Sequence, residues 1–161
     1  MSIILIPIVS YEILKFISYY ELDDLLPIFN LNANDRQTIK QKIYKQRLTI
    51  TKYNHRIEYR LEGKLHQENE LPAIEHIDGS KEWLINGKRH RLDGPALDFK
   101  CGYKAWWVNK LRHRENDLPA VELADGTLEW WVNGKLHREN GPAVIRANGS
   151  EEWWVEGKQV R

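Results

Sequence analysis

Four histidines recur at nearly constant intervals and are the side chains of this sequence most suited to chemistry. The intervals are 24, 23 and 24 residues, and the histidines are His66, His90, His113 and His137. Histidine can serve as a general base or a metal ligand, but no second ligand stands at a fixed short distance from any of the four. The simpler interpretation is that each histidine makes a hydrogen bond, to a glutamate or to the backbone, that closes one segment of a repeat.

The single cysteine is the other candidate for chemistry. Cys101 stands beside Gly102, where the neighbouring repeats have a tight turn, and this is a poor setting for a nucleophile. The sequence has no G-x-S-x-G, P-loop or H-E-x-x-H motif. We therefore expect a protein that is not an enzyme and that uses no cofactor or metal. A lone cysteine forms no intrachain disulfide, as is typical of a reducing compartment.

The histidines belong to a repeat of 23 or 24 residues. A proline followed by alanine recurs with the same period, at Pro72, Pro95, Pro119 and Pro142, and a glycine lies seven residues after each proline. A second turn mark comes eight residues after that glycine, at Gly87, Lys110, Gly134 and Gly157. A register held over this length indicates one structural unit, repeated.

Turn and strand signals alternate within each unit and predict antiparallel hairpins. The sequences around Gly79, Gly126 and Gly149 favour two-residue hairpin turns, and so does each Asn-Gly-Lys. The short runs between the turns are rich in Trp, Val, Ile and Leu, which suit strands. An earlier, divergent copy has Tyr59 at the tryptophan position. We therefore predict an antiparallel β-sheet of repeated hairpins over residues 48–161.

Residues 1–47 contain no tryptophan or glycine and predict three short helices. Ser10 is the expected cap of the first and Asp35 of the third, and Pro27 ends or kinks the second. The apolar positions expected to face inward are Ile13, Leu14 and Ile17, then Leu22, Leu25 and Leu26, then Ile39, Ile43 and Tyr44. The chain is thus predicted to be α+β, with a three-helix cap before the array.

Strand alternation sorts the aromatic residues of the array into two faces. One face is expected to be the packed core and carries Tyr59, Trp83, Trp106, Trp130 and Trp153, each with an aliphatic residue two positions later. The opposite face carries Leu84, Trp107, Trp131 and Trp154. An exposed aromatic stripe is typical of a protein-binding surface. The alternative is that the protein covers both faces itself, or that Lys and Arg stems lie over these rings.

Charge argues against a nucleic-acid partner. The chain has 24 Lys and Arg against 23 Asp and Glu. Residues 1–48 hold six of the basic and five of the acidic side chains, which leaves 18 of each sign for the repeats. Nucleic-acid binders usually carry a basic excess because phosphate contacts supply much of their affinity. We expect no nucleic-acid partner, and only a local basic stripe stays open.

The first residues indicate an intracellular protein. The apolar run from Ile3 to Val9 is too short to span a bilayer and contains Pro7. No basic segment precedes it and no small-residue cleavage site follows it. We therefore expect no membrane span and a cytoplasmic location.

The repeat resembles MORN repeats. A Trp or Tyr strand, "NGK" and a second glycine-marked turn recur about every 23 residues, and the fuller pattern "NGKxHRExGPA" is similar to degenerate MORN-like arrays of large eukaryotic DNA viruses. The resemblance covers residues 48–161 and implies a sheet of hairpins. It also implies a viral protein in the cytoplasm of a host cell or in the virion.

The N-terminal stretch resembles an F-box over residues 5–46. Ile6-Pro7 stands at the family's Leu-Pro, Glu12-Ile13-Leu14 at its "EIL" and Glu21-Leu22 at its "DL". The resemblance implies a Skp-family adaptor of a cullin ubiquitin ligase as partner. The implied contact residues are Pro7, Ile13, Leu14, Ile17, Leu22 and Leu25. The alternative is a plain helical cap on the array.

Together these features predict a protein-binding function. The first hypothesis is a substrate adaptor, in which the helical part engages the ubiquitin ligase and the array engages a target through Leu84, Trp107, Trp131 and Trp154. The second is a structural or scaffold protein, such as a virion component, whose repeat sheet packs against neighbouring copies.

Overall fold

The computed structural model describes residues 22, 32–68 and 70–161. The chain divides into two compact units, one of residues 1–49 with 61–63 and the other of residues 50–60 with 64–161. No helix among the described residues is long and apolar enough to cross a membrane.

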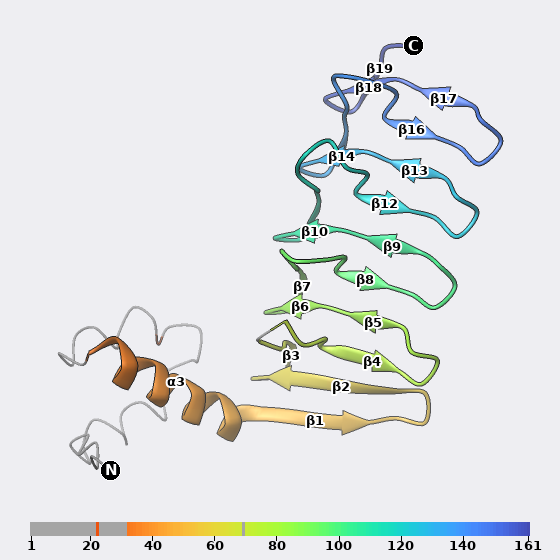
Figure 1. Cartoon of the computed structure of the whole chain (residues 1–161). Coiled ribbons are helices and arrows are strands. Elements are labelled where there is room, and N and C mark those ends of the chain that lie inside the picture. Colours follow the sequence, from red (N-terminus) through yellow and green to blue (C-terminus); the bar gives the residue numbers. More distant parts are fainter. Residues whose placement is uncertain (1–21, 23–31, 69) are drawn as a thin grey trace. The chain divides into compact units, whose positions relative to one another are not determined.

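The first unit contains helix α3, Ala33–Arg47 (Figure 1). Its buried residues are Ile39, Ile43 and Tyr44, as the sequence predicted. The predicted cap, Asp35, is wrong by three residues: Asn32 is the N-cap, and its side chain accepts a hydrogen bond from the Asp35 backbone N–H at 2.9 Å. Asp35 lies in the first turn, where a negative charge favours the helix dipole.

The expected three-helix cap is supported only in its third helix. The other two fall on residues outside the described ones, apart from Leu22, which is helical and fully buried. The α+β class and the array of repeated antiparallel hairpins match the prediction.

The second unit is a stack of hairpins that follow one another in sequence order (Figure 1). The main sheet has eleven strands in the order β1-β2-β4-β5-β8-β9-β12-β13-β16-β17, and β3 pairs with β2. Its strands are β1 Leu48–Lys52, β2 Arg56–Leu61, β3 Lys64–Leu65, β4 Ile74–His76, β5 Lys81–Glu82, β8 Leu97–Asp98, β9 Lys104–Ala105, β12 Val121–Glu122, β13 Leu128–Glu129, β16 Val144–Ile145 and β17 Glu151–Glu152.

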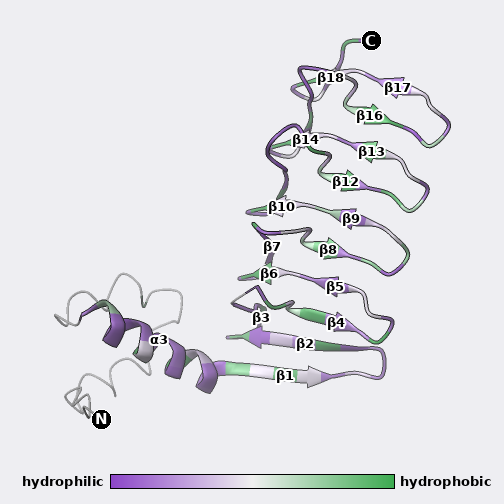
Figure 2. Ribbon diagram, viewed as in Figure 1, coloured by the Kyte–Doolittle hydropathy of each residue, from purple (hydrophilic) through white to green (hydrophobic). Residues whose placement is uncertain are grey.

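Four small hairpins line one edge of the stack, opposite the Asp-Gly-type turns (Figure 1). They are β6–β7, Leu84–Ile85 with Lys88–Arg89; β10–β11, Trp107–Val108 with Leu111–Arg112; β14–β15, Trp131–Val132 with Lys135–Leu136; and β18–β19, Trp154–Val155 with Lys158–Gln159. Figure 2 shows β4 and β16 as more hydrophobic than their partners β5 and β17.

The two kinds of turn differ. In the small hairpins both central residues have positive φ, for example Asn133 at 48° and Gly134 at 80°, as predicted for Asn-Gly. In the Asp-Gly turns only the glycine does, as at Gly79 with 94°. The carboxylate of Asp78 there accepts the Ser80 backbone N–H at 2.8 Å. These turns are longer than the predicted two-residue type.

The sheet register places two kinds of rows across the strands. One row alternates acidic and apolar residues except at Ala105, and it reads Glu58, Ile74, Glu82, Leu97, Ala105, Val121, Glu129, Val144 and Glu152. We call it the glutamate row. On the other face, opposite charges lie directly across from one another from Glu75 through Lys81, Asp98 and Lys104 to Glu122. Such cross-strand pairs stabilise the sheet.

Candidate functional site

Each repeated histidine links its own repeat to the next one. The Nδ1 atom accepts a hydrogen bond from a backbone N–H in the following small hairpin, at 3.0, 3.2, 3.3 and 3.1 Å, and the pairs are His66 with Asn86, His90 with Asn109, His113 with Asn133, and His137 with Glu156. A ring nitrogen that accepts carries no proton, so the neutral ring is protonated at Nε2. The predicted structural hydrogen bond is confirmed, with its partner in the neighbouring repeat.

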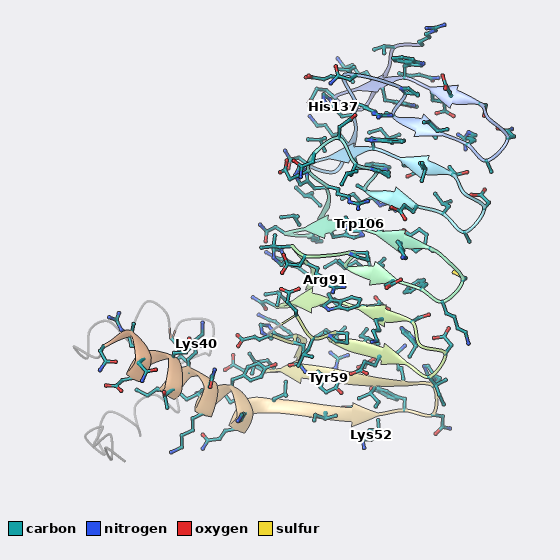
Figure 3. The ribbon with its side chains drawn as sticks, in the orientation of Figure 1. Lys40, Lys52, Tyr59, Arg91, Trp106 and His137 are labelled. Carbon is teal, nitrogen blue, oxygen red and sulfur yellow. The ribbon has the colours of Figure 1, made fainter. Side chains whose placement is uncertain are left out.

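The residue after the histidine covers the buried tryptophan of its repeat. The guanidinium carbons of Arg91, Arg114 and Arg138 lie 3.9, 3.7 and 3.9 Å from the ring centres of Trp83, Trp106 and Trp130. Figure 3 labels Arg91, Trp106 and His137 as examples of each side-chain type. Each arginine also donates from Nη1 to the carbonyl of the proline that follows it and opens the next repeat. The arginine therefore holds the connector over the tryptophan by a cation–π contact and a hydrogen bond.

Connectors of two lengths alternate, and the longer ones reach into the next repeat. The indole N–H of Trp83 donates to the Glu70 carbonyl at 2.9 Å, and that of Trp130 donates to the Asp117 carbonyl at 3.0 Å. The Asp117 carboxylate also accepts two hydrogen bonds from Arg138, both at 2.9 Å. These hydrogen bonds lower the pKa of Asp117 more than burial raises it.

Trp83, Trp106 and Trp130 are buried at 7, 9 and 6% exposure, which confirms this part of the predicted core face. Tyr59 and Trp153 are half-buried. Of the aliphatic residues two positions later, Leu61 is fully buried as predicted, but Ile85 and Val155 are 37 and 38% exposed and do not continue that face. The regular strand is interrupted at each tryptophan, so alternation no longer sets exposure beyond it.

The face expected to bind a target is covered by the protein itself. Leu84 is buried at 8% exposure in a cluster with Ala73 and Ile74, so it is not a surface residue. Trp107 and Trp131 are half-buried against the cluster of Leu97, Ala105 and Val121 in the glutamate row. Trp154, at the same position of the last repeat, is also half-buried.

Arginines lie over these rings and glutamates accept hydrogen bonds from their indole N–H groups. Arg112 lies between Trp107 and Trp131, 5.3 and 4.8 Å from their ring centres. The Trp131 indole donates to Glu129 at 2.7 Å and the Trp154 indole to Glu152 at 3.0 Å. The arrangement matches the alternative in which charged stems lie over the rings. Trp107, Trp131 and Trp154 remain half-buried, and their contact with a target stays a prediction.

One repeat lacks this acceptor. Ala105 stands where the other repeats have Glu82, Glu129 and Glu152, and the buried Trp107 Nε1 has no hydrogen-bond partner. The buried Nε of Arg112 is likewise unpartnered. A buried donor without an acceptor costs free energy.

Glu58 is the most buried carboxylate of the glutamate row, at 2% exposure. Burial raises its pKa, but hydrogen bonds and charge from Arg60 and Arg56 outweigh burial and hold the pKa below its usual value. Arg60 Nη2 lies 2.8 Å and Arg56 Nη2 2.7 Å from its oxygens. This buried charge is paired and structural, because both oxygens are held by guanidinium groups.

Three recesses follow the connectors. The largest of the three has a volume of about 830 Å³ and lies between the second and third connectors, residues 91–94 and 114–118. Its lining includes Leu92, Trp106, Arg114 and Leu118. The smaller two, about 180 and 230 Å³, contain Trp83 and Trp130. The lining mixes both signs of charge. Over residues 22, 32–68 and 70–161 no group of three His, Cys, Asp or Glu side chains could hold a metal ion.

The small hairpins present a second face that the sequence did not single out. Register pairs Ile85 with Lys88, Val108 with Leu111, Val132 with Lys135, and Val155 with Lys158. Their neighbours Leu84, Trp107 and Trp131 pack inward, so these four pairs form the opposite face, which we call the outer hairpin face. The sequence contained a signal for this face, because the residues immediately before and after the two turn residues of a hairpin lie opposite each other on its two strands.

Most residues expected to contact an adaptor lie outside the described residues. These are Pro7, Ile13, Leu14, Ile17 and Leu25. Leu22 is described and has 0% exposure, whereas a contact residue is expected to be exposed. Cys101 is exposed in its turn.

No protein family, curated protein or solved structure matches the chain.

Proposed function

We propose that this chain is a non-enzymatic protein-interaction module. The supporting observation is the recurrence of one hairpin surface along the second unit, in which the histidines, arginines and tryptophans are all engaged in holding repeats together. A stack of this kind displays the same chemistry at regular intervals, which suits an elongated partner better than a small substrate.

We infer that the module is a substrate adaptor of the F-box type in the cytoplasm, the host cytoplasm if the protein is viral. The F-box-like pattern from Ile6-Pro7 to Glu21-Leu22 supports this proposal, as does helix α3, which forms where the resemblance places its last helix. The helical segment would bind a Skp-family adaptor of a cullin ubiquitin ligase. The array would bind the target.

Titration with a purified Skp-family adaptor tests this proposal. We expect wild-type protein to bind at micromolar strength or better, about −8 kcal/mol. Pro7→Asp should weaken binding strongly, because a charge in a dry interface is left without a partner. Leu22 is unsuited as a second site because it is buried.

Leu92→Asp is the matched control, since Leu92 is 70% exposed in the array. It should leave adaptor binding unchanged, and circular dichroism should show that both variants fold. If wild-type protein does not bind at high micromolar adaptor, the adaptor proposal fails.

The second candidate is a structural or scaffold protein, such as a virion component. The complete burial of Leu22 favours it, because a scaffold would bury the helical face that an adaptor would have to leave open. Sedimentation over a range of concentrations distinguishes the two. A scaffold should form larger assemblies through its repeat sheet without any adaptor, whereas an adaptor should stay at one size.

A further inference from the structure

We propose that the outer hairpin face binds an acidic, extended protein segment that also carries apolar side chains. This inference rests on the proposed interaction function and names the partner chemistry of the array. It moves the expected binding surface from the inner side of the small hairpins to their outer side.

The outer hairpin face consists of an aliphatic row beside a mostly basic row. Ile85, Val108, Val132 and Val155 form the first, and Lys88, Leu111, Lys135 and Lys158 are their cross-strand partners. Ile85, Leu111 and Val155 are 37, 47 and 38% exposed, and the three lysines are exposed as well. Three of the four repeats therefore offer an exposed apolar side chain and three offer an exposed lysine, whereas Val108 and Val132 are half-buried.

This edge is mostly basic although the array as a whole is neutral. The hairpins 84–89, 107–112 and 131–136 contain five basic residues and no acidic one, and the fourth hairpin, 154–159, contains Lys158 and Glu156. Arg89 and Arg112 turn inward, within 5.5 and 5.3 Å of the Trp107 ring centre. Lys88, Lys110 and Lys135 are exposed. Lys135 contacts Glu156 of the next hairpin at 3.0 Å, but both side chains are more than half exposed, so a partner's carboxylate can compete.

The rows are continuous because the hairpins bond to one another. The backbone N–H of Lys110 donates to Arg89 O at 3.0 Å, that of Gly134 to Arg112 O at 2.9 Å, and that of Gly157 to Leu136 O at 2.9 Å. Each repeat adds two strands to the main sheet. Strands lie roughly 4.8 Å apart, so equivalent residues recur about every 10 Å.

The spacing of about 10 Å between equivalent residues matches a partner chain in the polyproline II conformation. A polyproline II segment rises about 3.1 Å per residue with three residues per turn, so every third side chain recurs on one face after about 9 Å. A segment with an acidic and an apolar residue in each group of three would place one row of carboxylates along the lysines and one apolar row along Ile85, Val108, Val132 and Val155.

A protein segment fits better than a nucleic acid. The aliphatic row has no counterpart on a phosphate backbone, and base stacking needs exposed aromatic rings. The rings of Trp107 and Trp131 are turned onto the core and stacked with Arg112. Charge complementarity then specifies an acidic chain.

The test uses two synthetic peptides of identical composition, labelled with a fluorophore, and the full-length protein. The first repeats Leu-Glu-Pro five times, and the second carries the same residues in scrambled order. We expect the ordered peptide to bind more tightly than the scrambled one, with affinity that falls as salt rises. A peptide with Lys in place of Glu should not bind.

Two triple variants of equal charge locate the site. Lys88→Gln with Lys110→Gln and Lys135→Gln should weaken binding about tenfold, as expected for loss of three contacts at the rim of an interface. Lys52→Gln with Lys81→Gln and Lys100→Gln removes three exposed lysines elsewhere in the array and should not change it. The double variant Ile85→Ser with Val155→Ser should also weaken binding, because it removes two apolar contacts with the peptide. Both side chains are exposed, so their loss should spare the fold.

Equal binding by both triple variants, or equal binding of the ordered and scrambled peptides, would overturn the inference. Binding of anionic vesicles or of an oligonucleotide, without binding of the ordered peptide, would overturn it in favour of that partner class. The adaptor titration is run on the same variants and should not change. Loss of peptide binding and loss of adaptor binding therefore report separately on this inference and on the F-box proposal.

Discussion

At the scale of single residues, the histidine, arginine and tryptophan that recur in each repeat all help to hold the repeats together. The histidine accepts a hydrogen bond from the next repeat, and the arginine that follows covers the tryptophan of its own repeat. Gly94 and Gly141 leave room for the same arginines, because a Cβ there would lie 2.9 Å from Arg91 Cζ and 3.0 Å from Arg138 Nη1.

Ala105→Glu should stabilise the protein by about 1 kcal/mol. The new carboxylate would take the place that Glu129 has beside Trp131 and would accept the Trp107 indole N–H, which lacks a partner. Urea unfolding of the variant and of wild type measures the difference. Ala105→Gln is the control for charge, and destabilisation by both would show that the buried site cannot admit the longer side chain.

Gly141→Ala should destabilise the protein by about 1–2 kcal/mol, because its Cβ displaces Arg138 from Trp130 and from Asp117. A double-mutant cycle with Arg138→Ala checks the reason. In the Arg138→Ala background the alanine should cost much less. An unchanged cost there would place the strain in the backbone.

At the scale of elements, neighbouring repeats are joined at three places: through the main sheet, through the small hairpins, and through the connectors. The histidine bonds belong to the small hairpins, since each acceptor meets the N–H of a turn residue such as Asn86 or Asn133. These bonds fix where each hairpin lies on the one before it.

His66→Ala should cost about 1–3 kcal/mol and speed amide exchange at Asn86, because it leaves that backbone N–H without its acceptor. His66→Asn offers an oxygen near the position of Nδ1 and should recover part of the loss. Urea unfolding and hydrogen exchange measure both variants. Equal losses for the two would indicate that packing of the buried ring, and not the hydrogen bond, is what matters.

At the scale of the whole array, the structural period is two repeats. Glu70 and Asp117, which reach the next tryptophan through their carbonyls, are 47 residues apart. Ser80 and Thr127, whose hydroxyls accept a backbone N–H from the next turn, are separated by the same interval. Long and short connectors therefore form pairs.

The array should lose stability in acid. Hydrogen bonds lower the pKa of Asp78, Asp117, Asp125, Glu152 and Glu156 below their usual values near 4. The folded chain then binds fewer protons than the unfolded chain, so stability is full above about pH 4.5 and falls as pH drops through the lower folded values. Urea midpoints between pH 7 and pH 3 measure the effect.

Asp117→Asn provides the control for acid sensitivity. It should be less stable than wild type at pH 7, because it loses the charge that pairs with Arg138. Its midpoint should then fall less between pH 7 and pH 3. An equally steep fall would exclude Asp117 as a contributor.

The amino-acid sequence alone determined the period, the turns of the small hairpins, the antiparallel pairing and the burial of Trp83, Trp106 and Trp130. These features depend on local backbone preference and on a pattern that is repeated four times, and both are visible in the order of residues along the chain. The inner face of α3, with Ile39, Ile43 and Tyr44, follows from helical spacing in the same way.

Only the tertiary structure decided which surfaces are exposed. Leu84, Trp107 and Trp131 alternate correctly with the buried tryptophans, yet they pack on the glutamate row because the small hairpins place them over the sheet. The alternation of side chains along a strand predicts the side of the sheet on which a residue lies, but it does not predict which other parts of the protein cover that side. Which backbone N–H meets which histidine depends on contacts between residues 19 or 20 positions apart, which no local pattern contains. Which ring each arginine covers also depends on the fold, although each arginine stands only eight positions after its tryptophan.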